Sequence, residues 1–82
     1  SPRVMLLDEP TRGIDVEAKR QVFEIIHDLS RRGIASIMVS SELEELVEVC
    51  HRILVLRKGR IVGQYAANEI DAEGLFEACL EE

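Results

Sequence analysis

Apolar residues recur along this chain with two different periods, which predict alternating strands and helices. Short runs of consecutive apolar residues predict strands at 4–7, 34–39, 53–56 and 61–65. Apolar residues at helical spacing predict helices at 16–32, from 41 to about 50, and at 72–80. The predicted order is β-α-β-α-β-β-α. We therefore expect an α/β fold, a parallel sheet with right-handed helical crossovers that ends in a β-hairpin and a C-terminal helix.

Polar residues and glycine mark the predicted helix ends. Asp15 suits the N-cap of the first helix, and Gly33 suits the left-handed position just past its end. Ser41 and Glu44 form a capping-box pattern, so the second helix is expected to open at Ser41. Asp71 is the expected cap of the last helix. The predicted buried faces are Ala18, Val22, Ile25, Ile26 and Leu29, then Leu43, Leu46, Val47 and Cys50, then Leu75, Phe76, Cys79 and Leu80.

Composition narrows the class of protein. With 82 residues, 46% of them apolar and 32% charged, the chain has the balance of a globular protein and at most one domain with a thin core. Its net charge of −6 argues against nucleic acid as a partner and against a polybasic membrane-surface module. Cys50 and Cys79 lie in apolar helical patterns, without zinc-ligand spacing. No apolar run approaches the ~20 residues that span a bilayer, so we expect a cytoplasmic location.

Candidate chemistry lies at the ends of two strands. Asp8 and Glu9 follow the first apolar run, and Ser40-Ser41-Glu42 follow the second. In open α/β sheets, ligands bind beyond the carboxyl ends of the strands. Mg²⁺ usually takes one or two protein carboxylates together with substrate phosphates, and Asp8 is placed to hold it. Glu9 is placed to accept a proton from an attacking water. Taken alone, two acids after an apolar run are better explained as a solvated strand end.

The residues around these acids form a larger pattern. The run Leu6 to Thr11, followed by Gly13-Ile14-Asp15, resembles the Walker B element and D-loop of ATP-binding-cassette (ABC) ATPases. The turn Val39 to Glu42 resembles the switch segment of that family, and the hairpin 53–65, with Lys58-Gly59-Arg60 at its tip, resembles a hairpin that the family carries next. Asp-Glu-Pro-Thr-Arg-Gly-Ile-Asp combined with Ser-Ser-Glu is similar to the second cassette of monosaccharide importers of the ribose, galactose and xylose type.

The resemblance implies roles for particular residues and partners. Asp8 would bind Mg²⁺ through water, Glu9 would be the general base for ATP hydrolysis, and Asp15 would reach across a cassette–cassette interface toward the opposing nucleotide. The implied cofactors are ATP and Mg²⁺. The implied partners are a second ATPase cassette and the transmembrane permease subunits of a sugar importer, which would hold the protein at the inner face of the cell membrane.

Position 41 departs from the family pattern. Most ABC cassettes have His there, in contact with the γ-phosphate, whereas this chain has Ser41, which carries no positive charge. Loss of one such contact typically lowers the rate by about 10²–10³-fold, so we expect a site that binds ATP but hydrolyses it slowly. Ser41 as a plain helix N-cap is the alternative. His27 lies in the middle of a helix well before the switch, and His51 follows the start of the switch helix by nearly three turns, so neither replaces the missing imidazole. Arg12 is most simply a solvated loop residue.

Two parts of such a site are missing from the sequence. No G-x-x-x-x-G-K-[ST] loop and no Leu-Ser-Gly-Gly-Gln signature occurs, so residues 1–82 are predicted to be a single partial domain of a P-loop NTPase, inactive alone. In the family, the phosphate-loop strand lies between the strands 34–39 and 53–56. Without it, we expect the chain either to close the gap or to self-associate through unpaired strand edges.

We consider three alternative functions for this chain. The first is the ATP-hydrolysing subunit of a monosaccharide importer, to which this chain contributes the Walker B element, D-loop and switch segment. The second is a regulatory cassette, in which bound ATP holds the cassette pair closed while the partner cassette turns over. The third is a phospho-acceptor signalling domain with Asp8 as acceptor, which the hairpin after Arg57-Lys58 disfavours. The sequence does not identify the sugar.

Overall fold

The computed structural model describes residues 4–80, which divide into two compact units between Ser41 and Glu42. The first unit holds strand β1 (Val4–Asp8), helix α1 (Val16–Arg31) and strand β2 (Ala35–Val39). The second holds helix α2 (Leu43–Val49), strands β3 (Arg52–Arg57) and β4 (Arg60–Ala66), the 3-10 helix η1 (Ala67–Glu69) and helix α3 (Ala72–Leu80). The predicted α/β fold and the order β-α-β-α-β-β-α are confirmed. Membership of both units in one domain remains a prediction.

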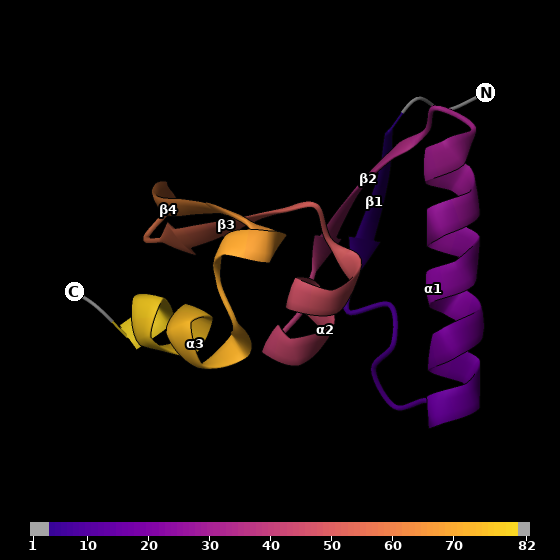
Figure 1. The fold of residues 1–82 in the computed structure, drawn as a ribbon, viewed down its shortest axis with the longest axis horizontal. Helices are drawn as coiled ribbons and strands as arrows, with labels where there is room; N and C mark the ends of the chain where they lie inside the picture. The colour runs from indigo at the N-terminus through magenta and orange to yellow at the C-terminus, as the bar shows by residue number, and fades with distance from the viewer. Residues whose placement is uncertain (1–3, 81–82) are drawn as a thin grey trace. The chain divides into compact units, whose positions relative to one another are not determined.

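Strands β1 and β2 pair in parallel, with α1 as the crossover between them (Figure 1). The register runs from Val4 opposite Ala35 to Asp8 opposite Val39. Parallel strands need a crossover of this length, because the chain must return to the end at which it started. Both strands therefore finish at the same edge, with Asp8 closing β1 and Val39 closing β2.

Helix α1 has the ends that its sequence predicts. The Asp15 carboxylate accepts a hydrogen bond from the Ala18 N–H at 2.8 Å, which satisfies one of the free donors of the first turn. At the other end Gly33 has φ +85°. The N–H groups of Gly33 and Ile34 bond to the carbonyls of Ser30 and Leu29, both at 3.0 Å, which is a Schellman motif. Glycine suits this position because a Cβ there is strained.

The sheet of the first unit is covered on one side only. Side chains alternate along both strands: Met5, Leu7, Ser36 and Met38 are half-buried, whereas Leu6 is 78% exposed and Ile37 56% exposed. The apolar run at 4–7 is typical of a strand buried on both faces, but only one face of this strand is buried. The reason is geometric, because α1 is the one helix that the structure describes between residues 4 and 41, and a helix covers one face of a sheet. Ile25 of α1, expected on the buried stripe, is also 60% exposed.

A tight hairpin forms the sheet of the second unit. Strands β3 and β4 pair antiparallel, with Arg57 opposite Arg60 and a register shift between Val55 and Leu56. Lys58 and Gly59 form the two-residue turn and have φ +51° and +79°. A turn with positive φ at both central residues matches the right-handed twist of the flanking strands, so the predicted basic-glycine tip is confirmed.

The core of the second unit is small. Ile53 and Val55 of β3 pack with Leu75 of α3, which is 1% exposed. The half-buried residues around them are Leu43, Leu46, Val47, Cys50, Tyr65, Ala67 and Ile70. Burial raises the pKa of the Cys50 thiol, which disfavours the reactive thiolate. The predicted face of α2 is confirmed, but that of α3 is too broad, since Phe76, Cys79 and Leu80 are exposed.

The described strands form two separate two-stranded sheets, β1–β2 and β3–β4. Closure of the gap by the chain itself stays a prediction, and so does self-association. Its physical basis is the apolar face of β1 and β2, where Val4, Leu6, Ile37 and Val39 are all more than half exposed. Between residues 4 and 80, no helix is both long enough and apolar enough to cross a membrane.

Two leucines of α3 test this description of the core. We expect Leu75→Ala to lower the free energy of unfolding by about 2–5 kcal/mol, because it opens a cavity beside Ile53 and Val55. Leu80→Ala removes the same atoms from a side chain that is 64% exposed, so it should change stability little. Urea unfolding followed by circular dichroism measures both. Equal losses for the two variants would contradict the placement of the core.

Candidate functional site

The parallel pairing of β1 and β2 brings the two candidate segments together at one edge of the sheet. The ladder continues one residue past β1, where the Glu9 N–H donates to the Val39 carbonyl at 2.7 Å. Glu9 is thereby held beside the end of β2, and Ser40 and Ser41 follow directly. The sequence prediction that the acids and the serines share the carboxyl edge is confirmed as geometry.

Glu9 has an uncommon backbone conformation. Its φ is +48°, in the left-handed region, which costs a residue with a Cβ about 1–2 kcal/mol. Pro10 follows and disfavours the right-handed helical region for the residue before it. The Glu9 carbonyl then accepts from the Arg12 N–H at 3.1 Å, which closes a turn. Strained backbone of this kind is concentrated at functional sites, where the surrounding structure maintains it.

The Glu9 carboxylate binds Ser41 directly. The Ser41 N–H donates to Oε1 at 2.8 Å, and the Ser41 hydroxyl lies 3.5 Å from Oε2. These contacts join residues 32 positions apart in the sequence. The sequence context of Ser41 predicted that this residue is the N-cap of α2. That prediction is wrong. The helix begins at Leu43 with Glu42 as N-cap.

Asp8 lies next to Glu9 as the last residue of β1, with an exposed side chain. Within residues 4–80, no group of three or more His, Cys, Asp or Glu side chains is arranged to hold a metal ion. A protein-only metal cage is therefore not formed by this part of the chain. One exposed carboxylate at a strand end does fit Mg²⁺ that is held mainly by phosphates and water.

Asp15 belongs to the same unit but serves α1. Its carboxylate caps the helix through the Ala18 N–H, and no hydrogen bond described here joins it to Glu9 or Ser41.

The loop before Asp15 contains two further residues of note. Gly13 has φ +77°, a turn conformation in which a side chain would be strained. Thr11 is only 4% exposed, an uncommon burial for a polar loop residue. Threonine in a turn gave no signal of burial in the sequence.

The other candidates are exposed. Arg12, His27 and His51 all have exposed side chains, and both histidines lie outside the Glu9–Ser41 contact. For these three residues the structure adds no contact that would favour a role in chemistry.

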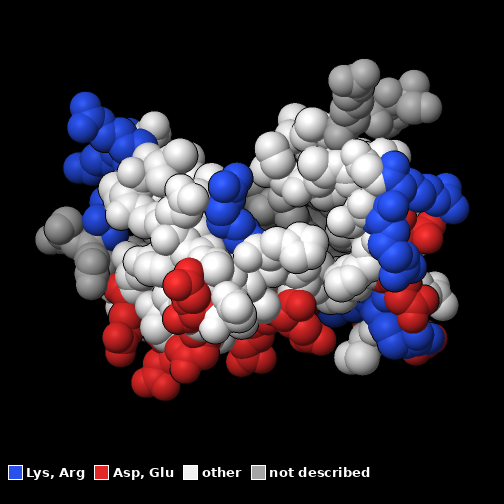
Figure 2. Space-filling view, turned by 45° about the horizontal axis from the view of Figure 1, so that its top comes forward, with Lys and Arg blue, Asp and Glu red and all other residues white. Residues whose placement is uncertain are grey.

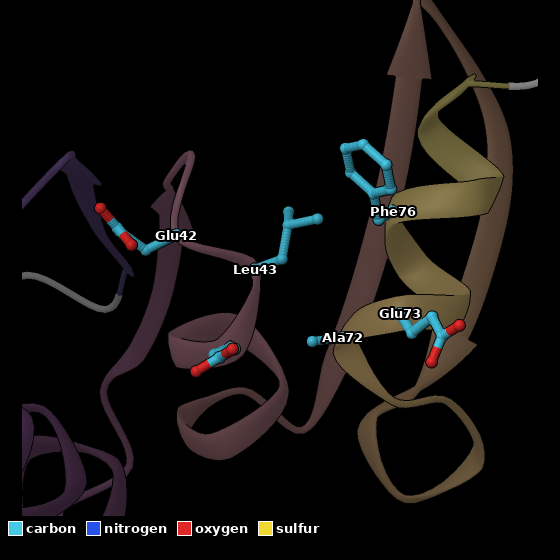
Figure 3. Close-up of a pocket in the computed structure, with 6 residues that line it drawn as sticks. Glu42, Leu43, Ala72, Glu73 and Phe76 are labelled. Carbon is cyan, nitrogen blue, oxygen red and sulfur yellow. The ribbon is translucent and has the colours of Figure 1, made fainter.

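The second unit has an open hollow of about 500 Å³ between α2 and α3 (Figure 3). Leu43 and Phe76 face this space from the two helices, and Ala72 lies at its base. The remaining lining residues are Glu42, Glu44 and Glu73. Figure 2 shows acidic side chains gathered along one edge of this unit. Three carboxylates around the hollow repel phosphate, so it is unsuited to a nucleotide.

Comparison with known proteins shows which proteins this chain is similar to. Over 72 residues the chain is 50% identical to ribose import ATP-binding protein RbsA 2 of Rhizobium meliloti, and this match covers 88% of the chain and 14% of the relative. Over 78 residues it is 49% identical to arabinose import ATP-binding protein AraG 1 of Burkholderia thailandensis, covering 95% of the chain and 16% of the relative. The chain matches one segment of a sugar-import ATP-binding protein.

A solved structure gives the same result for the fold. CbiO1 of Clostridium perfringens, part of the ABC transporter complex cbiONQ, superposes with a TM-score of 0.72 at 26% identity. The match covers 83% of this chain and 28% of that one. No protein-family model matches the chain. The predicted α/β architecture, a fragment of the fold of this ABC ATPase, is confirmed, whereas its place at the C-terminal end of such a domain stays a prediction. The chain spans about 15% of the length of the relative RbsA from Bacillus subtilis.

The capping role of Asp15 can be separated from any role in nucleotide turnover. Asp15→Ala should lower the free energy of unfolding by about 1 kcal/mol, since the first turn of α1 loses its acceptor. Asp15→Asn keeps an acceptor oxygen and should retain most of that stability while removing the charge. Chemical denaturation measures both variants. If Asp15→Ala unfolds at the same denaturant concentration as the unchanged chain, the cap contributes nothing.

Proposed function

We propose that this chain is the C-terminal part of an ATP-binding cassette that drives import of a monosaccharide. The supporting observation is the identity of 49–50%, across nearly the whole chain, to ribose and arabinose import ATP-binding proteins. The strand-end acids add chemistry that suits this function. In the proposed protein, the phosphate-binding loop and the signature sequence belong to the rest of the polypeptide, so activity requires the full length.

The two acids have different tasks in this proposal. Mg²⁺, when bound, would offset charge on the phosphate oxygens, and Asp8 would hold it through water at the end of β1. Glu9 would orient the attacking water and accept its proton. Its carboxylate has about four lone-pair positions, of which the N–H and hydroxyl of Ser41 use at most two, so acceptor positions remain for water.

Asp15 would face a second cassette in the assembled protein. Its side chain is exposed while it caps α1, and a carboxylate can accept more than one hydrogen bond. Further partners would be the transmembrane permease subunits of the importer. Contact with them would hold the ATPase at the inner face of the membrane.

A regulatory cassette is the second candidate, and position 41 favours it. Ser41 has no imidazole, and its hydroxyl lies within 3.5 Å of Glu9. In this variant of the proposal, ATP at this site would hold two cassettes together while the partner cassette hydrolyses. Both candidates share the binding site and differ only in the turnover at it. No observation on this chain favours phosphorylation of Asp8.

Replacing Asp8 and Glu9 by their neutral amides in the full-length polypeptide tests the nucleotide site that both candidate functions share. Glu9→Gln should lower kcat at this site by about 10²–10⁴-fold with ATP binding retained, because the proton acceptor is lost. Asp8→Asn should weaken Mg²⁺-dependent ATP binding. Steady-state hydrolysis and nucleotide binding are measured with the other nucleotide site inactivated, and Glu24→Gln on α1 is the matched control. Full binding and turnover with both acids neutral would refute the function.

Histidine at position 41 distinguishes the motor from the regulatory cassette. If the missing imidazole limits hydrolysis, Ser41→His should raise kcat at this site by on the order of 10²-fold. Ser41→Ala should bring no such rise. The same hydrolysis assay measures both variants. An unchanged kcat in Ser41→His would show that the serine is not what makes this site slow.

A further inference from the structure

The contact between Glu9 and Ser41 is made by two donors of unequal quality. The backbone N–H of Ser41 lies 2.8 Å from Oε1, a good distance for a hydrogen bond to a carboxylate. The hydroxyl lies 3.5 Å from Oε2, at the outer limit for such a bond. The amide is also fixed in direction by the chain leaving β2, whereas a hydroxyl rotates freely. The anchoring of the carboxylate therefore comes from the amide.

Glu9 is held at both ends by β2 and the turn that follows it. Its own N–H donates to the Val39 carbonyl at 2.7 Å, and its carboxylate accepts from Ser41, two residues further along. Its φ of +48° is compatible with both contacts. Glutamate has three rotatable side-chain bonds, and a general base must lie within about 2.6–3.2 Å of the proton it takes. A second fixed point removes much of the freedom that would take the carboxylate out of reach.

We propose that the backbone amide of Ser41 is the group that positions the Glu9 carboxylate for catalysis. The proposal rests on the function proposed above. Because the donor is backbone, every residue type except proline at position 41 supplies it. A cassette without histidine at this position thus keeps its general base oriented, and what it loses is charge stabilisation alone. Ser41 is in this sense a positioning residue, acting through Glu9.

Hydrogen exchange at the Ser41 amide tests the contact itself, in the full-length polypeptide and at single-residue resolution. Glu9→Ala should speed exchange of this amide by on the order of tenfold, because its acceptor is removed. Glu9→Gln keeps an acceptor oxygen in place and should retain most of the protection. Asp8→Asn is the matched control, since it neutralises the adjacent acid and leaves Glu9 intact. Equal exchange in all four proteins would overturn the proposal.

Turnover tests the catalytic consequence. With the other nucleotide site inactivated, Ser41→Pro removes the amide donor and should lower kcat by on the order of 10²-fold, with KM for ATP nearly retained. Ser41→Ala removes only the hydroxyl and should cost at least about tenfold less. Glu9→Asp places its carboxylate one methylene short of the amide and should behave as Ser41→Pro does, which guards against a folding defect caused by proline.

The results separate this inference from the proposed function. If Glu9→Gln abolishes turnover while Ser41→Pro and Glu9→Asp cycle as well as Ser41→Ala, the positioning role is wrong and the function stands. If Glu9→Gln cycles normally, the function is wrong, whatever the exchange data show. A rise in KM with unchanged kcat in Ser41→Pro would also overturn the positioning role, because it would place the amide in ATP binding.

Discussion

The parallel pairing of β1 with β2 is the constraint on which the site depends. Five residue pairs, from Val4 opposite Ala35 to Asp8 opposite Val39, set the register, and the Glu9 N–H extends it by one bond to Val39. A slip of one residue would turn every side chain of the strand to the other face. It would also move the Glu9 carboxylate away from the Ser41 amide. The register of the β1–β2 pair, the turn at Glu9 and the contact between Glu9 and Ser41 therefore depend on one another.

At Glu9, an unfavourable backbone conformation is combined with hydrogen bonds that hold it in place. The left-handed backbone at Glu9 is unfavourable alone, and Pro10 restricts the alternatives. The hydrogen bonds to Val39 and Ser41 offset that cost and fix the carboxylate at the sheet edge. A carboxylate oriented before substrate arrives needs no reorganisation during the reaction. Among the described residues of the first unit, no apolar side chain is fully buried.

The sequence was sufficient to predict the helices and strands. It was also sufficient to predict that Asp8, Glu9 and Ser41 lie at one edge of the sheet. Runs of apolar residues gave the strands, and Asp15 and Gly33 gave the ends of α1, because these signals act locally. Burial was predicted less well. Leu6 and Phe76 look like core residues in sequence, yet 78% and 55% of their surfaces are exposed. Periodicity identifies an apolar face, but what covers that face depends on the chain around it.

The start of α2 shows a second limit of sequence reasoning. Ser41 and Glu44 carry a capping-box pattern, which would use Ser41 within its own helix. In the structure, Ser41 instead donates a hydrogen bond to Glu9, 32 residues earlier in the sequence, and the helix begins after Glu42. A contact over this separation leaves no periodic signal in one sequence. The left-handed φ of Glu9 was hidden in the same way, since glutamate rarely adopts it.

A crystal structure of the full-length polypeptide, carrying Glu9→Gln and bound to ATP and Mg²⁺, tests the central claim most directly. We expect the triphosphate beyond the carboxyl ends of β1 and β2, with the metal facing Asp8 directly or through one water. The side-chain oxygen at position 9 should still accept from the Ser41 N–H. A triphosphate bound at another edge of the fold, or a side chain at position 9 turned away from Ser41, would contradict the claim.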